Sequence, residues 1–179
     1  MSILIYHDGT LIADHRGYVE TEGLDFWTDM NKIFKSVNND AYLGVVGREV
    51  LKDHQDIIDL MILVIHDKAT AEQRQKLLDE VSGRSFVLMT KDEAHSYGSL
   101  HRNVELLKDS RYSCFGDGQV SIMTSLHMGL SVKEAIEISH RSSYGTPRGT
   151  ELNVTLVSSS ALLPINLNNY FKEPSNEPL

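Results

Sequence analysis

Two residues near the start of the chain, Asp14 and Lys32, have side chains that could act together as an acid and a base. Residues 3–6 alternate in the manner of a strand, and Asp8-Gly9 supplies the positive-φ residues that a two-residue turn requires. The return strand then leads to Asp14, and Lys32 follows on a later strand. The hairpin therefore allows Asp14 and Lys32 to approach one another beside the start of the chain. This is the outline of a site whose nucleophile is an N-terminal residue.

The composition favours one folded domain. A length of 179 residues suffices for one sizeable core and is short for two. The 17 lysines and arginines against 25 acidic residues give a net charge of −8, which argues against nucleic acid and anionic membranes as partners. Cys114 is the only cysteine, so no internal disulfide can form, and we expect a small buried side chain and a reducing, cytoplasmic location.

Residues 57–65 form the most apolar run of the chain. The run is about half as long as a membrane crossing requires, and Asp59 interrupts it, so it predicts a buried helix. The N-terminus has no basic region followed by an apolar stretch, and we therefore expect no export signal.

Two helix pairs are expected. Apolar residues follow helical spacing from Arg48 to Ile65, and a capping box at Thr70 and Gln73 opens the next helix, which Gly83 closes. The second pair is expected within residues 117–141.

The second pair follows the turn Gly116-Asp117-Gly118. We expect Asp117 to be the N-cap of its first helix, and Ser131 with Glu134 to form a capping box on the other. Because almost no linker separates these two helices, they should be antiparallel neighbours.

Strands are expected in the remaining part of the core, at residues 3–6, 11–13, 33–37, 41–46, 84–90, 104–107, 112–115 and 152–157. Residues 17–31 are expected to form a turn region or short strands. Runs of strands that alternate with helix pairs predict an α+β fold, a four-layer αββα sandwich of two antiparallel sheets flanked by helix pairs. We expect the domain at residues 1–162 and a loosely held C-terminal tail at 163–179, which is rich in Pro, Asn, Glu and Ser.

The sequence indicates no metal and no cofactor. The eight histidines, His140 among them, form no i, i+4 pair with a glutamate between and do not join the cysteine, so each is expected on the surface or in a strand. No GxSxG elbow is present. Gly116-x-Gly118 lacks the third glycine, or the lysine, of a phosphate-binding loop.

Several segments carry a family likeness through their order and spacing, namely DGTLIADHRG, NKIF, AYLGVVG, CFGDGQVSIMTSLHMGLSVKEAIEISHRSS and GTELNVTLV. From Ser2 to about Val157 the chain resembles a proteasome β-type subunit or its bacterial two-component peptidase counterpart. The resemblance implies the fold of the N-terminal-nucleophile hydrolases. It also implies rings built through helix faces, so we expect a homo-oligomer, a ring or a stacked ring, with contacts through the helix pairs at 48–81 and 117–141.

The resemblance also implies roles for single residues. In the family the first residue of the mature chain attacks an amide, its α-amino group is the base, a lysine lowers the pKa of that amine, and an aspartate holds the lysine. Asp14 matches the aspartate and Lys32 matches the lysine. The nucleophile does not match, because the family has a threonine further upstream and this chain has Met1-Ser2. Twelve positions separate Ser2 from Asp14, fewer than in the family, which predicts that Ser2 lies too far along the strand.

Other departures from the family concern its supporting residues. Residues 142–149 lack the acid that the family has after its last helix, and Asp117 replaces a hydroxyl. We therefore expect a divergent member without peptidase activity that assembles with itself or binds a protein partner. An active amidase that uses Ser2, Asp14 and Lys32 after removal of Met1 is the alternative. An unrelated domain with a small-molecule pocket, and a purely structural Asp14–Lys32 ion pair, also stay open.

Overall fold

The computed structural model describes residues 2–21, 24–47, 53–98, 101–108, 111–144 and 153–170, and the side chains in these ranges except at 17–21, 24–28, 101–102 and 143–144. One antiparallel sheet has the strand order β10 (Ser113–Gly116), β1 (Ile3–His7), β2 (Thr10–Asp14) and β11 (Val154–Ser158). Asp8 and Gly9 have φ angles of 46° and 63°, which confirms the predicted turn between β1 and β2.

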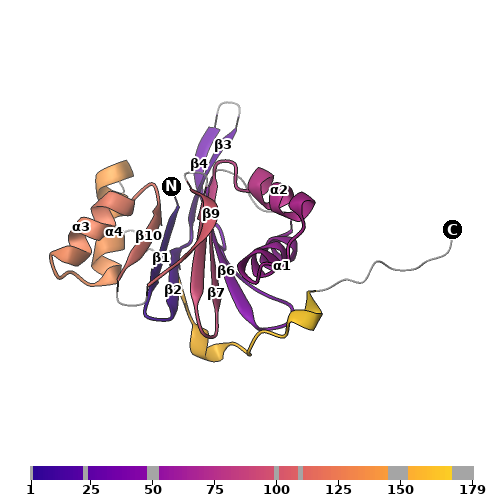
Figure 1. Cartoon of the computed structure of the whole chain (residues 1–179). Helices are drawn as coiled ribbons and strands as arrows, with labels where there is room; N and C mark the ends of the chain where they lie inside the picture. Colours follow the sequence, from indigo (N-terminus) through magenta and orange to yellow (C-terminus); the bar gives the residue numbers. More distant parts are fainter. Residues whose placement is uncertain are drawn as a thin grey trace.

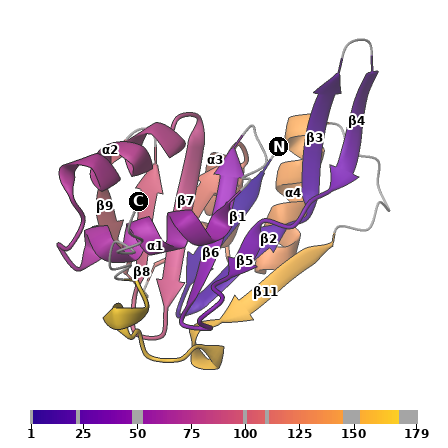
Figure 2. The ribbon, with the colours of Figure 1, turned by 90° about the vertical axis from the view of Figure 1, so that its right-hand side faces the viewer.

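The other large sheet is also antiparallel, with the order β5 (Ile33–Lys35), β6 (Ala41–Gly47), β7 (Arg84–Thr90), β8 (Ala94–Gly98) and β9 (His101–Leu106). A separate hairpin joins β3 (Arg16–Thr21) to β4 (Leu24–Asp29) and extends beyond the body of the molecule, as Figure 2 shows. The sequence predicts no strand at 94–98. Strand β8, which was not predicted, is short and contains a histidine, a serine and a glycine, so few of its residues are typical of strands.

Each of the two large sheets is covered on its outer face by a helix pair (Figure 1). The pairs are α1 (His54–Ile65) with α2 (Ala71–Glu80), and α3 (Gln119–His127) with α4 (Val132–Tyr144). The predicted α+β fold, a four-layer αββα sandwich, is therefore confirmed. None of the described helices is long and apolar enough to cross a membrane.

Local hydrogen bonds set the starts of the helices. The capping boxes predicted at Thr70 and Ser131 are both present. The prediction of Asp117 as an N-cap is wrong, because Gly118 occupies that position and no side chain caps α3. Asp53 caps α1, and the residues 48–52, in which a helix start was predicted, lie outside the described part.

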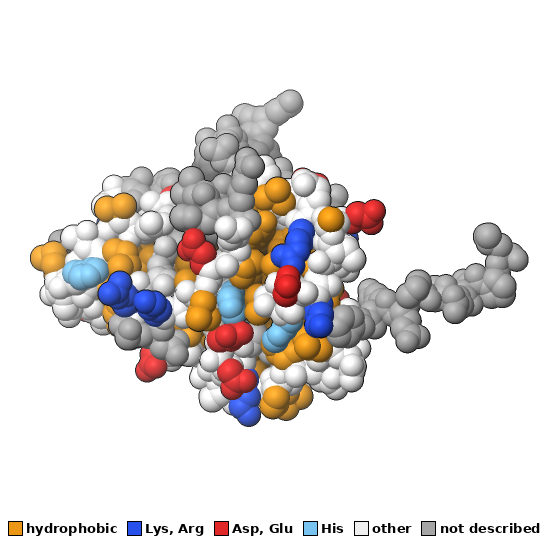
Figure 3. All heavy atoms as spheres, viewed as in Figure 1, with side chains coloured by type: hydrophobic (Ala, Val, Ile, Leu, Met, Phe, Trp, Pro, Cys, Tyr) orange, Lys and Arg blue, Asp and Glu red, His pale blue; other side chains and the backbone are white. Residues whose placement is uncertain are grey.

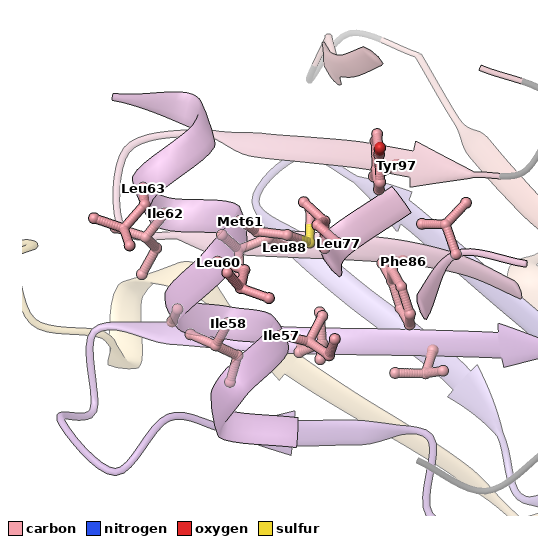
Figure 4. Packing of buried hydrophobic residues seen from close by; sticks show 14 of the residues in the cluster. Ile57, Ile58, Leu60, Met61, Ile62, Leu63, Leu77, Phe86, Leu88 and Tyr97 are labelled. Atoms are coloured by element: carbon pink, nitrogen blue, oxygen red, sulfur yellow. The ribbon is translucent and has the colours of Figure 1, made fainter. Parts of the chain in front are cut away.

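The largest apolar cluster lies between α1, α2 and the β5–β9 sheet (Figure 4). Helix α1 contributes Ile57, Ile58 and Met61, which are at most 1% exposed. The predicted buried helix at 57–65 is thus present. Burial of such aliphatic side chains contributes about 1.5–3 kcal/mol each and dominates the stability of this side.

Ile165, Leu167 and Tyr170 pack against this cluster. The hydroxyl of Tyr170 donates to Asp40 Oδ1 at 2.5 Å, and the Leu163 amide donates to the carbonyl oxygen of Asn39 at 2.9 Å. Ser36 Oγ donates to the same oxygen of Asp40 at 2.7 Å. Part of the expected tail therefore contacts the folded part, and the division of the chain at residue 162 stays a prediction.

Candidate active site

The site is built around Asp14, the last residue of β2. Its neighbour on the same face of the strand, Ile12, packs in the apolar cluster with Ile122 and Ile136 of α3 and α4. The alternation of side chains along β2 therefore directs the Asp14 side chain toward the same helix pair. Asp14 is fully buried, and its Oδ1 accepts hydrogen bonds from the Ile3 amide at 2.8 Å and from Lys32 Nζ at 2.5 Å.

Lys32 comes from the opposite sheet, directly before β5. Its side chain is 5% exposed, and Nζ also donates to the carbonyl oxygen of Arg16 at 2.6 Å. The structure thus brings Asp14 and Lys32 together, as the hairpin predicts. Their catalytic role stays a prediction.

Burial and charge act in opposite directions on this pair. Burial raises the pKa of Asp14, but the hydrogen bond from His140 and the charge of Lys32 lower it more, so the net pKa lies below the usual value and the group is a carboxylate. Burial lowers the pKa of Lys32 and outweighs the opposing effects of Asp14 and Asp117. The Lys32 ammonium therefore gives up its proton more readily than an exposed lysine does.

His140 of α4 is a member of the site that the sequence interpretation missed. It is completely buried, and its Nε2 lies 3.0 Å from Asp14 Oδ2. The expectation of a surface or strand histidine is wrong here, because residue 140 lies on the buried face of a helix. Its position four residues after the apolar Ile136, within the predicted helix pair at 117–141, was the available signal.

The turn Gly116-Asp117-Gly118 lies against the start of the chain. Gly116 has a φ of +98°, and a Cβ there would lie 1.8 Å from the carbonyl oxygen of Ser2, so the position requires glycine. Asp117 lies close enough for its charge to raise the pKa of Lys32. The aspartate thus acts on the site and not as a helix cap.

Ser2 lies at the border of this cluster, because it directly precedes Ile3, whose amide binds Asp14. Ile3 and Ile5 pack toward α3 and α4, whereas Leu4 packs in the cluster between the two sheets. If the same alternation continues backward from β1, the Ser2 side chain belongs to the face of Leu4 and not to that of Asp14. The predicted role of Ser2 as a nucleophile stays untested, and most of the supporting segment 142–149 lies outside the described residues.

The described residues contain no group of three or more His, Cys, Asp or Glu side chains that could hold a metal ion. Cys114 is buried, and burial raises its pKa to about 12, so it is a thiol and a poor nucleophile.

Comparison with known proteins shows the fold of the chain. No protein-family model matches the sequence, and no curated protein matches it. The structure is similar to eukaryotic HslV from Trypanosoma brucei, with a TM-score of 0.53 and 13% identity over 88% of this chain and 98% of that one. It is also similar to BPH from Thiobacillus denitrificans, solved in complex with epoxomicin, with a TM-score of 0.50 and 12% identity over 89% of this chain and 98% of that one. The chain therefore has a proteasome-like, N-terminal-nucleophile hydrolase fold.

Proposed function

We propose that this proteasome-like protein does not hydrolyse peptides and acts by assembling with copies of itself or with a protein partner. The alternation of side chains along β1 carries the first half of the proposal. At the Asp14 carboxylate, β1 presents the Ile3 amide, and the alkyl side chain of Ile3 lies on the Asp14 face. The hydroxyl of Ser2 would face away from the carboxylate. The ammonium of Lys32 contacts Asp14 Oδ1 directly, so a hydroxyl that faces away from this carboxylate also lies apart from the ammonium.

Exposed apolar side chains support assembly through the α3–α4 pair. Val120 and Met128 are 77% and 76% exposed, and Ile138 is 39% exposed. Figure 3 shows apolar groups on the side of the molecule that these helices form. In a ring such side chains would be covered by a neighbouring copy.

Light scattering coupled to size-exclusion chromatography tests the assembly. We expect a mass several times that of the 20.1 kDa chain at micromolar concentration. Val120→Glu with Met128→Glu should reduce the mass to that of the monomer. Val37→Glu, at a site 76% exposed outside both helix pairs, is the matched control and should leave the mass unchanged. A wild-type monomer would contradict self-assembly.

An active amidase that uses Ser2 is the second candidate. It is favoured by the buried Asp14–Lys32 pair beside the start of the chain, where burial lowers the pKa of the lysine. In this reading Ser2 attacks the amide after Met1 is removed, and its own α-amino group is the base.

Intact-mass spectrometry of the native protein, before and after incubation with epoxomicin, separates the two candidates. Our proposal predicts no epoxomicin adduct, whether or not Met1 is removed. An adduct on protein that lacks Met1, lost in Ser2→Ala and kept in Ser82→Ala, an exposed serine after α2, would establish the amidase and overturn the proposal. Retention of Met1 would exclude the amidase.

A further inference from the structure

Strand β11 is the outermost strand of its sheet and is paired with β2 on one side (Figure 2). The amide of His15 donates to the carbonyl oxygen of Asn153, at the start of this pairing. Because backbone groups along an antiparallel strand alternate in direction, Val154, Leu156 and Ser158 direct their amide and carbonyl groups to the other side. No described strand is paired there. The open side of β11 thus offers the hydrogen-bonding pattern that a further strand requires.

The other terminal strands of the two large sheets have features that hinder pairing. Strand β5 has three residues and ends in Lys35, and β10 has four residues and ends at Gly116. Strand β9 contains Arg102 and Glu105, and its pairing with β8 is irregular. Charged residues, short strands and irregular pairing are usual means by which proteins keep sheet edges from associating. Strand β11 has five residues, none of them charged, and a regular register with β2, so it is the edge best suited to bind a further strand.

The side chains of β11 add an apolar strip to this edge. Leu156 and Val154 are 63% and 38% exposed. Leu156 is paired in register with Ile12, whose side chain packs in the cluster under α3 and α4, so Leu156 lies on the same face of the sheet. Its exposure shows that the two helices cover this face only in part. A strand with apolar side chains at alternate positions would cover the strip and bind the open backbone groups at the same time.

We propose that β11 pairs with β11 of a second copy, antiparallel and about a two-fold axis at Leu156. This register pairs all five residues, with Leu156 opposite its own copy and Val154 opposite Ser158, and it directs the open backbone groups of both strands toward each other. Because the strand carries no charge, no like charges meet at the axis. A five-residue strand buries far less than a standard interface, so the contact is weak. It does not depend on the α3–α4 contact, with which it shares no residue.

Sedimentation equilibrium of the Val120→Glu, Met128→Glu variant, in which the α3–α4 contact is removed, tests the pairing of β11 by itself. We expect the weight-average mass to rise from 20.1 kDa toward twice that value between about 10 µM and 1 mM, the range of a weak contact. Leu156→Lys or Leu156→Glu in the same background should raise the dissociation constant more than about tenfold at low salt, because two like charges then face each other.

An equimolar mixture of the Leu156→Lys and Leu156→Glu variants is the sharpest test. Pairing should return in the mixture, because opposite charges then meet at the axis. Leu163→Lys, at a site 56% exposed outside β11, is the control and should pair like the parent variant.

A parent variant that stays monomeric up to about 1 mM would overturn the proposal and would favour a strand of another protein as the occupant of this edge. Charge variants that pair as well as the parent, or a mixture that does not recover, would also overturn it. If the wild type fails to assemble through α3 and α4, the test of β11 is unaffected, so the failure of one proposal is distinguished from the failure of the other.

Discussion

The two halves of the sandwich bury different kinds of side chain. The half made of α1, α2 and the β5–β9 sheet buries mainly aliphatic and aromatic side chains, such as Met61 and Phe86, and its one buried carboxyl, Asp40, accepts hydrogen bonds from neutral hydroxyl groups among the described residues. The half made of α3, α4 and the β10-β1-β2-β11 sheet also has an apolar cluster, but it buries Asp14 and His140 completely at the same time. Lys32 belongs to the other half, and its ammonium forms an ion pair with the Asp14 carboxylate.

The two halves therefore differ in the cost of what they bury. Apolar burial is favourable without further partners, whereas a buried charge costs several kcal/mol unless its partners are well placed. The buried Asp14 carboxylate therefore depends on its partners, whereas the apolar clusters do not.

The largest effect should come from Lys32→Met, which leaves the Asp14 carboxylate buried without its main counter-charge. We expect a loss of about 3–5 kcal/mol in the free energy of unfolding, measured by urea titration. Lys76→Met is the control on the other half. Its ion pair with Asp56 is just as short, at 2.5 Å, but its side chain is 56% exposed, so its loss should cost about 0–1 kcal/mol. Equal losses would show that burial of the charge is unimportant.

A similar or slightly smaller effect is expected in the apolar half. Met61→Ala removes a fully buried side chain next to β6 and β7 and should cost about 2–5 kcal/mol. Thermal unfolding measured by circular dichroism is sufficient to detect it. Val37→Ala, at a position 76% exposed outside both helix pairs, should change stability by less than about 0.5 kcal/mol. If both variants unfold like the wild type, the assigned core is incorrect.

His140 provides a finer test of the charged half. His140→Leu removes the group beside Asp14 Oδ2 and should cost about 1.5–3 kcal/mol, because the contact involves a charged acceptor. His140→Gln, which can still donate a hydrogen bond, should recover part of this loss. If the leucine variant is as stable as the wild type, the histidine does not stabilise the carboxylate.

The features that the sequence predicts correctly are mostly local. The Asp8-Gly9 turn and the capping boxes at Thr70 and Ser131 depend on residues within three positions of each other, and all are present. The pairing of Asp14 with Lys32 spans 18 positions, but the β1–β2 hairpin and the family likeness make it predictable.

The features that were missed depend on contacts across the fold. His140 reaches Asp14 from a position 126 residues away, because α4 packs on β2, and no local pattern encodes this distance. Aspartate is a common N-cap residue, yet Gly118 occupies the N-cap position of α3. Asp117 instead lies close enough to Lys32 to raise the pKa of the lysine. Tyr170 follows a polar, proline-containing segment, but its hydroxyl binds Asp40 and its ring enters the α1 cluster. The composition of this segment could not predict that Tyr170 binds the folded part.

The smallest effects concern the two capping boxes, one on each half. Thr70→Ala should lower the free energy of unfolding by about 1 kcal/mol at any pH, because Gln73, its partner in the box, does not ionise.

At Ser131 the partner is Glu134, whose pKa is lowered by the hydrogen bonds from the hydroxyl and amide of Ser131. A folded-state pKa below the unfolded one gives stability that is present at neutral pH and is lost as the pH falls through the folded value. Ser131→Ala should therefore destabilise the protein at neutral pH and have a smaller effect at acidic pH, as measured by urea titrations at both. Equal pH dependence of the two variants would contradict the assignment of Glu134 to this box.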